Sequence, residues 1–312
     1  MFPKVSILIP CYNAEKWVAQ AITSALEQTY PNKEVIVVDD GSTDDSVAII
    51  KSFGSLIHWE SQSNQGGNPT RNRLLELSTG EWLQYLDADD YLLPEKIEQQ
   101  VNLLSQEPEA DIICSPAITE YHQDGKVWQE ASASLQPRDP WILLAKWALP
   151  QTGGSLWCKQ ALVDVGGWAN QQPCCQEHEL YSRLLMAGKK FAYWDESRAV
   201  YRLWNNNSVS RKDKWEPFRR RLEIKDRIEA FLEQQNQLTQ ERQNAINQAR
   251  FACARVIYND YPSWASQIIS QIHQQEPNFL PITSVPKFYQ LIYQVLGFSI
   301  TEKVASFKRK FY

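Results

Sequence analysis

The sequence predicts an α/β protein with a mostly parallel sheet flanked by helices, followed by a C-terminal helical extension. Short apolar runs rich in β-branched residues alternate with helical patterns along the first part of the chain, which is typical of βαβ units. Acidic and polar residues follow several of these runs, at the strand ends where open α/β sheets bind ligands. From about residue 215 the chain becomes rich in Arg, Glu and Gln and nearly lacks Gly, which favours helices.

Length and composition support this layout and exclude several classes of protein. The chain has 312 residues, of which 43% are hydrophobic, so it can bury a core and is not globally disordered. Its length exceeds the size at which a single core stops growing, so we expect one large domain with an appendage. The net charge of −5 argues against a dedicated nucleic-acid binder, because such proteins carry basic surfaces.

Cysteine spacing and the N-terminus bear on metal sites and location. The six cysteines include no Cys-x-x-Cys pair, which argues against a zinc site, and we expect free thiols in a reducing compartment. The N-terminus lacks the pattern of a signal peptide, and no uncharged apolar window of about 18 residues is present. The cytoplasm is therefore the expected location.

The first part of the chain predicts alternating strands and helices. A buried strand at 5–9 ends at Pro10, and Asn13 is placed to cap a helix at 14–28. Further strands are expected at 34–38, 56–60 and 81–86, and further helices at 44–53, 70–78 and 94–105.

The later patterns predict a hairpin and several shorter elements. The hairpin joins 112–121 to 126–130 around Asp124-Gly125. Helices are expected at 140–148, 159–165 and 177–188, and strands at 153–157, 191–194 and 199–203. Two helices are expected within 215–259, broken near Leu238-Thr239.

An acidic cluster follows the strand at 81–86. Asp87, Asp89 and Asp90 would repel one another at this strand end, and a divalent cation would relieve that repulsion. Oxygen ligands point to Mg²⁺ or Mn²⁺, which borrow further ligands from a bound phosphate. A solvated turn is the alternative, and the second acidic strand end at Asp39-Asp40 favours a site.

Residues at the first two strand ends suit a nucleotide base. Tyr12 and Asp40 would face each other across neighbouring strands, where a ring stacks on a base and a carboxylate accepts its N–H. This acceptor favours uracil or thymine. Arg71, after the flexible Gly66-Gly67, would reach a base or phosphate, and a surface salt bridge is its alternative. The chain has neither a GxGxxG turn nor a GxxxxGK[ST] loop.

Five segments in a fixed order carry a resemblance. They are Val5-Ser-Ile-Leu-Ile-Pro-Cys-Tyr-Asn13, Val37-Val-Asp-Asp-Gly-Ser-Thr-Asp44, Thr70-Arg-Asn72, Gly80-Glu-Trp-Leu-Gln-Tyr-Leu-Asp-Ala-Asp-Asp90 and Gly166-Gly-Trp168. Together they resemble glycosyltransferase family 2, with the Rossmann-like GT-A fold. The resemblance covers about residues 3–210, so we expect a catalytic domain at 1–210 and a helical region at 211–312.

The resemblance implies a metal-dependent, inverting transferase that uses nucleotide-diphosphate sugars, most often UDP-sugars, with Mn²⁺ or Mg²⁺. Carried over position by position, the donor-nucleotide residues are Pro10, Tyr12, Asn13, Asp40, Arg71 and Asp87. Asp89 matches the metal-binding residue.

The segment Gln176-Glu-His-Glu-Leu-Tyr-Ser-Arg183 matches the segment that bears the catalytic base. The aligned base, usually Asp, is Glu177, and its usual Glu neighbour is Gln176. A rival assignment places the base at Glu179. A further departure is Trp204, where many relatives carry a His that touches the metal or diphosphate, which puts a third protein ligand in doubt.

The remaining expectations concern acceptor and location. Acceptor-side candidates are the Gly153-Gly154 pair, Trp157, Trp168, Glu179 and Trp204, with core packing as the alternative for the rings. The acceptor is expected to be a saccharide or a lipid-linked saccharide in polysaccharide assembly. The tail from Ser299 carries Lys303, Lys308, Arg309 and Lys310 among Phe298, Phe307, Phe311 and Tyr312, which suggests peripheral contact with anionic lipid at the inner face of the plasma membrane.

Two other functions remain open. A sugar nucleotidyltransferase would need a basic, Gly-rich loop after the first strand, which residues 10–13 do not supply. An inactive nucleotide-sugar-binding or carbohydrate-binding relative is kept open by the change from Asp to Glu at the base.

Overall fold

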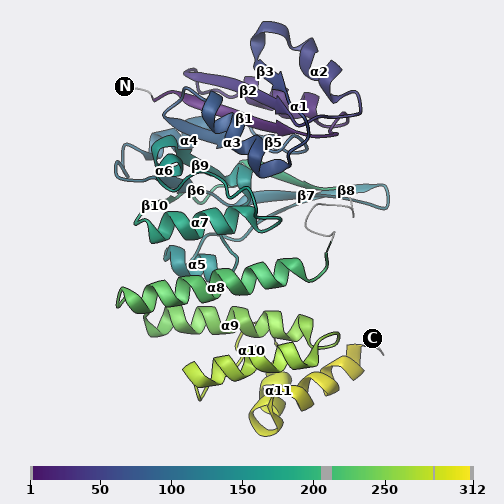
Figure 1. Cartoon of the computed structure of the whole chain (residues 1–312), viewed down its shortest axis with the longest axis vertical. Coiled ribbons are helices and arrows are strands. Elements are labelled where there is room, and N and C mark those ends of the chain that lie inside the picture. The colour runs from purple at the N-terminus through teal and green to yellow at the C-terminus, as the bar shows by residue number, and fades with distance from the viewer. Residues whose placement is uncertain (1–2, 205–212, 284, 310–312) are drawn as a thin grey trace. The chain divides into compact units, whose positions relative to one another are not determined.

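The computed structural model describes residues 3–204, 213–283 and 285–309 (Figure 1). The chain divides into two compact units, residues 1–143 with 148–212 and residues 144–147 with 213–312. The first unit is a mixed α/β structure and the second is helical.

A seven-stranded sheet forms the centre of the first unit, with strand order β10-β6-β9-β4-β1-β2-β3. Its strands are β1 (Val5–Cys11), β2 (Lys33–Asp39), β3 (His58–Ser61), β4 (Trp82–Tyr85), β6 (Ile112–Cys114), β9 (Ser155–Cys158) and β10 (Phe191–Tyr193). Only β9 runs antiparallel to its neighbours, β4 and β6. The carboxyl ends of β1, β2 and β4 therefore meet at one edge, as the sequence predicts.

Helices flank this sheet because their apolar faces pack on its buried strands. They are α1 (Val18–Leu26), α2 (Ser46–Ser52), α3 (Gly67–Leu77), α4 (Lys96–Leu103), α6 (Lys159–Asp164) and α7 (Gln176–Met186). A further short helix, α5 (Pro140–Ala145), follows the hairpin in the chain. Short 3₁₀ turns lie at η1 (Gly54–Leu56) and η2 (Thr152–Gly154). Strand residues such as Ile7 and Val37 join Val18 and Ile22 of α1 in one fully buried cluster.

Two local expectations about the first strand are wrong. β1 continues through Pro10 to Cys11, because β4 stops pairing with β1 at Leu8 and the missing N–H of Pro10 breaks no ladder on that side. Asn13 does not cap α1, which begins at Val18. Its side-chain oxygen instead accepts a hydrogen bond from the Thr43 amide at 2.8 Å.

A second sheet has the order β5-β11-β7-β8, with β5 (Tyr91–Leu92), β7 (Ala117–Gln123), β8 (Lys126–Ala131) and β11 (Ala199–Leu203). The predicted strand at 112–121 is in fact two strands, β6 and β7, that belong to different sheets. Pro116 lies between them and provides no backbone donor for a continuous ladder. β7 and β8 form the predicted hairpin, which extends away from the central sheet (Figure 1).

The second unit contains α8 (Glu216–Gln234), α9 (Gln240–Ile257), α10 (Pro262–Gln275) and α11 (Lys287–Arg309). The predicted break near 238–239 is confirmed, since the Thr239 side chain caps α9 by accepting from the Arg242 amide. Phe251 of α9 lies at the centre of the hydrophobic core of this second unit. It contacts four rings from the segments that follow in the chain: Phe279, Tyr289, Tyr293 and Phe298. α11 is kinked at Gly297, whose φ of 69° suits glycine.

Two further expectations are met in the described residues. All six cysteines are free. Within 3–204, 213–283 and 285–309, none of the helices has the length and apolarity that a bilayer crossing requires.

Candidate active site

The acidic cluster lies directly after β4, and each carboxylate has a different partner. Asp87 pairs with Arg71, with 2.7 Å between Oδ1 and Nη2. Asp89 Oδ2 accepts the indole N–H of Trp204 at 2.9 Å. Asp90 is buried and accepts the Arg202 backbone amide at 2.8 Å. The strand end therefore holds three carboxylates within one short turn.

Crowding and burial disfavour the charged forms of these groups. Burial, and then repulsion by Asp87, raises the pKa of Asp89 above its usual value. Burial and the neighbouring Asp89 and Asp87 raise the pKa of Asp90 well above its usual value. A positive charge bound at this edge would favour both carboxylates in their ionised form.

Arg71 of α3 links the acidic cluster to α7. Its Nη1 donates to Gln176 Oε1 at 2.9 Å, and its guanidinium lies 5.0 Å from the centre of the Trp168 ring. Burial disfavours the Arg71 cation, but Asp87 and Glu177 outweigh this and hold the pKa of Arg71 above its usual value. Arg71 is thus held by Gln176, and it lies within electrostatic reach of Glu177.

Glu177 lies in the first turn of α7 and is half-buried. Its Oε1 accepts the hydroxyl of Thr152, from η2, at 2.5 Å. Unpaired backbone N–H groups at a helix N-terminus interact favourably with such a carboxylate. The side chain is therefore oriented by a buried hydroxyl while part of it stays accessible.

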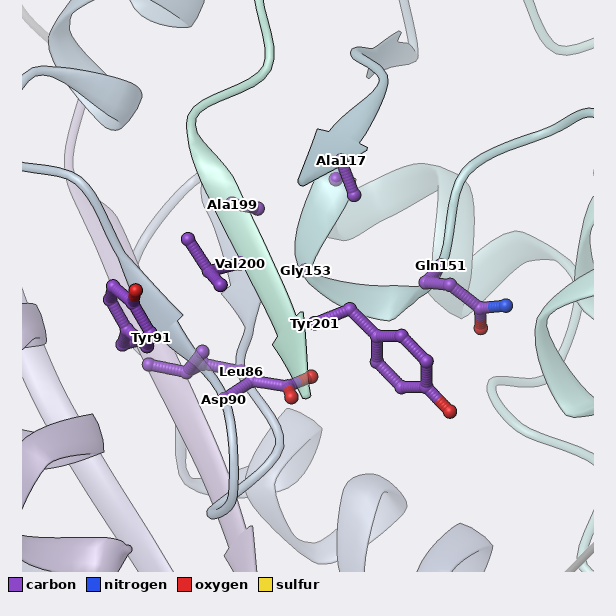
Figure 2. A pocket seen from close by; sticks show the side chains of 10 residues that line it. Leu86, Asp90, Tyr91, Ala117, Gln151, Gly153, Ala199, Val200 and Tyr201 are labelled. Carbon is purple, nitrogen blue, oxygen red and sulfur yellow. The ribbon is translucent and has the colours of Figure 1, made fainter. Parts of the chain in front are cut away.

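Tyr201 of β11 connects this carboxylate with the acidic strand end. Burial raises the pKa of its phenol, and Asp90, Asp87, Asp89 and Glu177 all add to the effect. Figure 2 shows the Tyr201 ring projecting from β11 on the side of Gln151, with the Asp90 carboxylate close to the end of the same strand. Tyr201 therefore lies within electrostatic reach of both Glu177 and the acidic cluster.

Glu179 differs from Glu177 in its surroundings. It is buried, and its carboxylate pairs with Arg183 one turn later at 2.8 Å. Arg183 also donates to the Val165 carbonyl at 2.6 Å, which ties α7 to the preceding segment. His178 is buried and packs edge-on against Tyr181.

The first two strand ends lie side by side, since Cys11 pairs with Asp39 and the Asp40 amide donates to the Cys11 carbonyl. Tyr12 is 51% exposed. Asp40 is buried and accepts from Gln62 Nε2 and from the Gln65 and Gly66 amides at 2.8–2.9 Å. Since a carboxylate offers about four acceptor positions, one remains.

The structure corrects part of the acceptor prediction. Trp168 is 1% exposed and packs against Tyr85 and Trp157, so it supports Arg71 from the core and offers no face to a sugar. Trp157 is also fully buried. Gly154 is a packing position, because a Cβ there would lie 2.6 Å from the Ser115 carbonyl and from Pro150.

Trp204 lies beside the acidic cluster, not at a separate acceptor surface. Its N–H reaches Asp89, and its ring lies 5.8 Å from that of Trp17.

Several residues of the site carry no signal in the sequence. The Arg202 guanidinium lies 4.5 Å from the ring centres of both Trp17 and Tyr91, pairs with Glu120, and donates to the Asp89 carbonyl at 2.8 Å. Thr152 reaches Glu177 from 25 residues away. Only the fold brings such distant positions together.

The donor atoms present fit a divalent cation held largely by its substrate. Among the described residues no group of three His, Cys, Asp or Glu side chains is arranged as a metal site. Asp89 keeps acceptor capacity beyond its indole bond, and burial and then the neighbouring Asp87 raise its pKa. One carboxylate with phosphate oxygens is a normal ligand set for Mg²⁺.

Comparison with known proteins identifies the family. A model of Glycosyl transferase family 2 matches residues 6–163, which is half of the chain. An uncharacterized glycosyltransferase of Rickettsia typhi is 41% identical over 111 residues, covering 36% of this chain and 35% of that protein. The match thus spans about a third of the length of this relative.

Solved structures share the fold. Residues 1–349 of S. aureus TarS superpose with a TM-score of 0.66 at 16% identity, over 99% of this chain and 92% of that one. The mannosyltransferase PcManGT of Pyrobaculum calidifontis, solved with GDP-Man and Mn²⁺, gives a TM-score of 0.55 at 15% identity, over 97% and 87%. These likenesses confirm the GT-A fold. With its family model covering β1 to α6 and the acidic strand end of β4, this chain belongs to glycosyltransferase family 2.

Proposed function

We propose that this chain is an inverting glycosyltransferase that moves a sugar from a nucleotide-diphosphate sugar to a hydroxyl of a saccharide or lipid-linked acceptor. The observation that carries the proposal is the placement of Glu177. It is half-buried, oriented by Thr152, and within electrostatic reach of Arg71 and of Tyr201 beside the acidic strand end. This is the arrangement that a positioned general base requires.

In the proposed reaction, Glu177 removes the proton of the acceptor hydroxyl, and the hydroxyl oxygen attacks the anomeric carbon from the face opposite the nucleotide. The bond to the leaving diphosphate breaks in the same displacement, so the configuration inverts. Arg71 is held in place by Asp87 and Gln176 and places a fixed positive charge near the diphosphate.

For the donor we propose a UDP-sugar. Tyr12 offers an exposed ring, and Pro10, Asn13 and Asp40 form the neighbouring wall. The remaining acceptor position of Asp40 suits the N3–H of uracil. TarS has been solved with UDP-GlcNAc, and PcManGT with GDP-Man, which supports a nucleotide-sugar donor in this fold.

We also propose that the enzyme depends on Mn²⁺ or Mg²⁺. Asp89 is the residue that would hold the cation, with Asp87 nearby. When bound, a divalent cation neutralises charge on the leaving diphosphate. The chain itself orients Asp89 through the Trp204 N–H and fixes its backbone through Arg202.

The alternatives receive less support from the geometry. Glu179 as base is disfavoured because Arg183 already occupies its buried carboxylate. A sugar nucleotidyltransferase would release pyrophosphate instead of a nucleoside diphosphate. An inactive binding relative is disfavoured by the close Thr152–Glu177 contact, which orients a carboxylate at the site.

Glu177→Gln tests the proposal, with Glu179→Gln as the matched control on the same helix. We expect the first variant to keep donor-induced thermal stabilisation and to lose transfer by a factor of about 10² to 10⁴. The control should lower stability through its broken pair with Arg183 and keep transfer. Near-normal turnover of Glu177→Gln, or the opposite ranking of the two variants, would refute the assignment.

Peripheral contact with an anionic membrane is a second proposal, and α11 supplies its support. One side of this helix exposes Phe288, Leu291 and Val295, the last being 80% exposed. The segment 277–312 contains five basic residues and one acidic residue, in a chain whose net charge is −5. That acid, Glu302, is buried and paired with Arg255 at 2.7 Å.

The membrane prediction changes in detail. Phe298 is buried against Phe251 and Tyr258, so it is not a lipid contact, and the exposed apolar stripe lies upstream of the predicted tail. Lys303 is exposed as expected. Lys310, Phe311 and Tyr312, and the side chains of Phe307, Lys308 and Arg309, lie outside the described residues. A location at the inner face of the plasma membrane remains part of the proposal.

A further inference from the structure

The four-stranded sheet has two faces of different character. Directly paired residues in a sheet point to the same face, and alternate residues along a strand do so as well. One face carries Arg202, Glu120 and Gln129. Arg202 and Gln129 both donate to the Glu120 carboxylate, which also accepts the Tyr91 hydroxyl. This face is closed by packing against Trp17.

The other face runs from the proposed active site to the hairpin and is rich in rings. The register pairs Tyr201 with Thr119 and Leu203 with Tyr121. It then pairs Thr119 with Glu130 and Tyr121 with Trp128 across the hairpin. We call this set of six residues the ring face.

The outer end of the ring face is a stacked pair of aromatic rings. Tyr121 and Trp128 lie 5.0 Å apart, with 11° between their planes. Trp128 nevertheless remains 39% exposed, and its N–H lies 3.3 Å from Glu130 Oε1. Flat apolar surface bordered by carboxylate and hydroxyl groups matches a sugar, which has C–H faces and hydroxyl edges.

The inner end of the ring face borders the acidic strand end of the proposed active site. Tyr201 and Asp90 line one pocket, and the Tyr201 ring projects from β11 on the side of Gln151 (Figure 2). Trp128 lies two strands across and two residues along from Tyr201, which is about 12 Å at ordinary strand spacings. This span suits a short oligosaccharide, not a single sugar.

We propose that the ring face is an extended acceptor subsite, in which a saccharide chain of several sugars lies along Tyr201, Tyr121 and Trp128 with its reacting hydroxyl at Glu177. The inference rests on the proposed function and deepens it. It makes the hairpin of β7 and β8 the element that selects acceptors by chain length. Trp128 is a binding residue in this account and takes no part in the chemical step.

Trp128→Ala tests the subsite, with Val127→Ala as the matched control. Val127 is the neighbouring residue on the same strand, is 60% exposed, and lies on the opposite face because it pairs with His122. The probe is a printed array of defined bacterial oligosaccharides of one to six sugars, incubated with full-length protein and saturating UDP.

We expect the wild-type protein and Val127→Ala to retain the longer oligosaccharides. Trp128→Ala should bind them about tenfold more weakly, which corresponds to about 1.4 kcal/mol, with single sugars unaffected. Trp128→Phe keeps a flat ring and should restore most of the binding. Unfolding midpoints of all variants report whether the hairpin is intact.

Equal binding by Trp128→Ala and Val127→Ala would overturn the proposal, as would a wild-type protein that retains no oligosaccharide. Glu177→Gln separates this result from the proposed function, since it should bind the array normally. The proposed function would stand even without an acceptor subsite on the ring face if two results hold. A nucleotide sugar should stabilise the protein, and the wild type should transfer the sugar while Glu177→Gln does not.

Discussion

The two units of this chain hold buried charge in opposite ways. In the α/β unit, the buried carboxylate of Asp90 lies beside the half-buried carboxylate of Asp89, and the pKa values of both are raised. In the helical unit, Arg250 is fully buried but pairs with both Glu229 and Asp226 at 2.5–2.7 Å. Burial alone would raise the pKa of Glu229, but its bonds to Arg250 hold that pKa below its usual value.

Under the proposed function, this difference separates a ligand-binding site from a scaffold. Groups that stay crowded and poorly compensated lower stability, and proteins retain them where a ligand or a reaction uses them. Groups whose charge is fully paired contribute to the specificity of the fold. The acidic end of β4 belongs to the first kind and the Arg250 cluster to the second.

The largest effect is expected from Asp89→Ala. Transfer should fall at least 100-fold, because charge on the leaving diphosphate loses its counterpart. Stability should not fall in parallel, since the variant removes a carboxylate whose pKa burial and Asp87 already raise. Transfer assays with Mn²⁺ and thermal unfolding, run side by side, measure both quantities.

Trp204→Phe is the control for Asp89→Ala, because it removes the indole donor and leaves the carboxylate. Its activity should stay within a few-fold of wild type. Activity that resists EDTA, with Asp89→Ala still turning over normally, would remove the metal from the mechanism.

Arg250→Met should have the largest effect on stability. It leaves Glu229 buried without its cation, and breaking such a pair costs about 3–5 kcal/mol. Denaturant unfolding measures the loss, and hydrogen exchange of the α9 amides places it in the helical unit. The double variant Arg250→Met with Glu229→Leu should regain part of the loss. If the single variant is as stable as wild type, the network does not stabilise this unit.

The strands and candidate site residues of the α/β unit are easier to predict from the sequence than the exposed surfaces of the helical unit. Buried strands such as 34–38 give continuous apolar runs, and the acidic residues after β4 stand out beside them. Contacts that join distant positions give no such signal. The bond from Thr152 to Glu177 and the position of Arg202 between two rings depend on packing that no local pattern records.

The exposed surfaces of the helical unit are harder to predict because its sequence contains no motif that indicates a function. The break at Thr239 follows from capping chemistry and was predictable. The exposed stripe of α11 could not be predicted, because Phe298 and Val295 are both apolar. Which of the two is buried depends on the kink at Gly297 and on the contact between Phe251 and Phe298. For the same reason the burial of Trp168 could not be distinguished from a role in acceptor binding.

Glu120→Gln tests a satisfied carboxylate inside the α/β unit. Burial raises the pKa of Glu120, but bonds from His122, Gln129, Tyr91 and Arg202 outweigh this and lower it to about 2. A lowered carboxyl pKa adds stability that is present above about pH 4.5 and is lost as the pH falls toward 2. At pH 7 the free energy of unfolding of the variant should be about 2 kcal/mol lower than that of the wild type. Between about pH 4.5 and pH 2 the variant should lose less stability than the wild type does. Parallel unfolding curves at pH 7 and pH 3 measure this, and an equal acid loss in both proteins would contradict it.

The smallest effect on the folded molecule is expected from Leu291→Glu with Val295→Glu, yet it bears directly on what the helical unit does. Both side chains are exposed, so the free energy of unfolding should change by less than about 0.5 kcal/mol. Binding to vesicles of phosphatidylglycerol and phosphatidylcholine should fall about tenfold, because the apolar stripe can no longer enter the interface.

The matched control for this pair is Gln290→Glu with Gln294→Glu, which adds the same charge at the same spacing beside the stripe. If the control weakens sedimentation with these vesicles as much as the stripe variant does, charge alone accounts for the contact. If the wild-type protein does not sediment with anionic vesicles, the stripe is not a membrane surface. A loss of vesicle binding that is confined to the stripe variant would assign membrane contact to the helical unit. That function would be separate from the catalysis proposed for the α/β unit, whose crowded carboxylates follow β4.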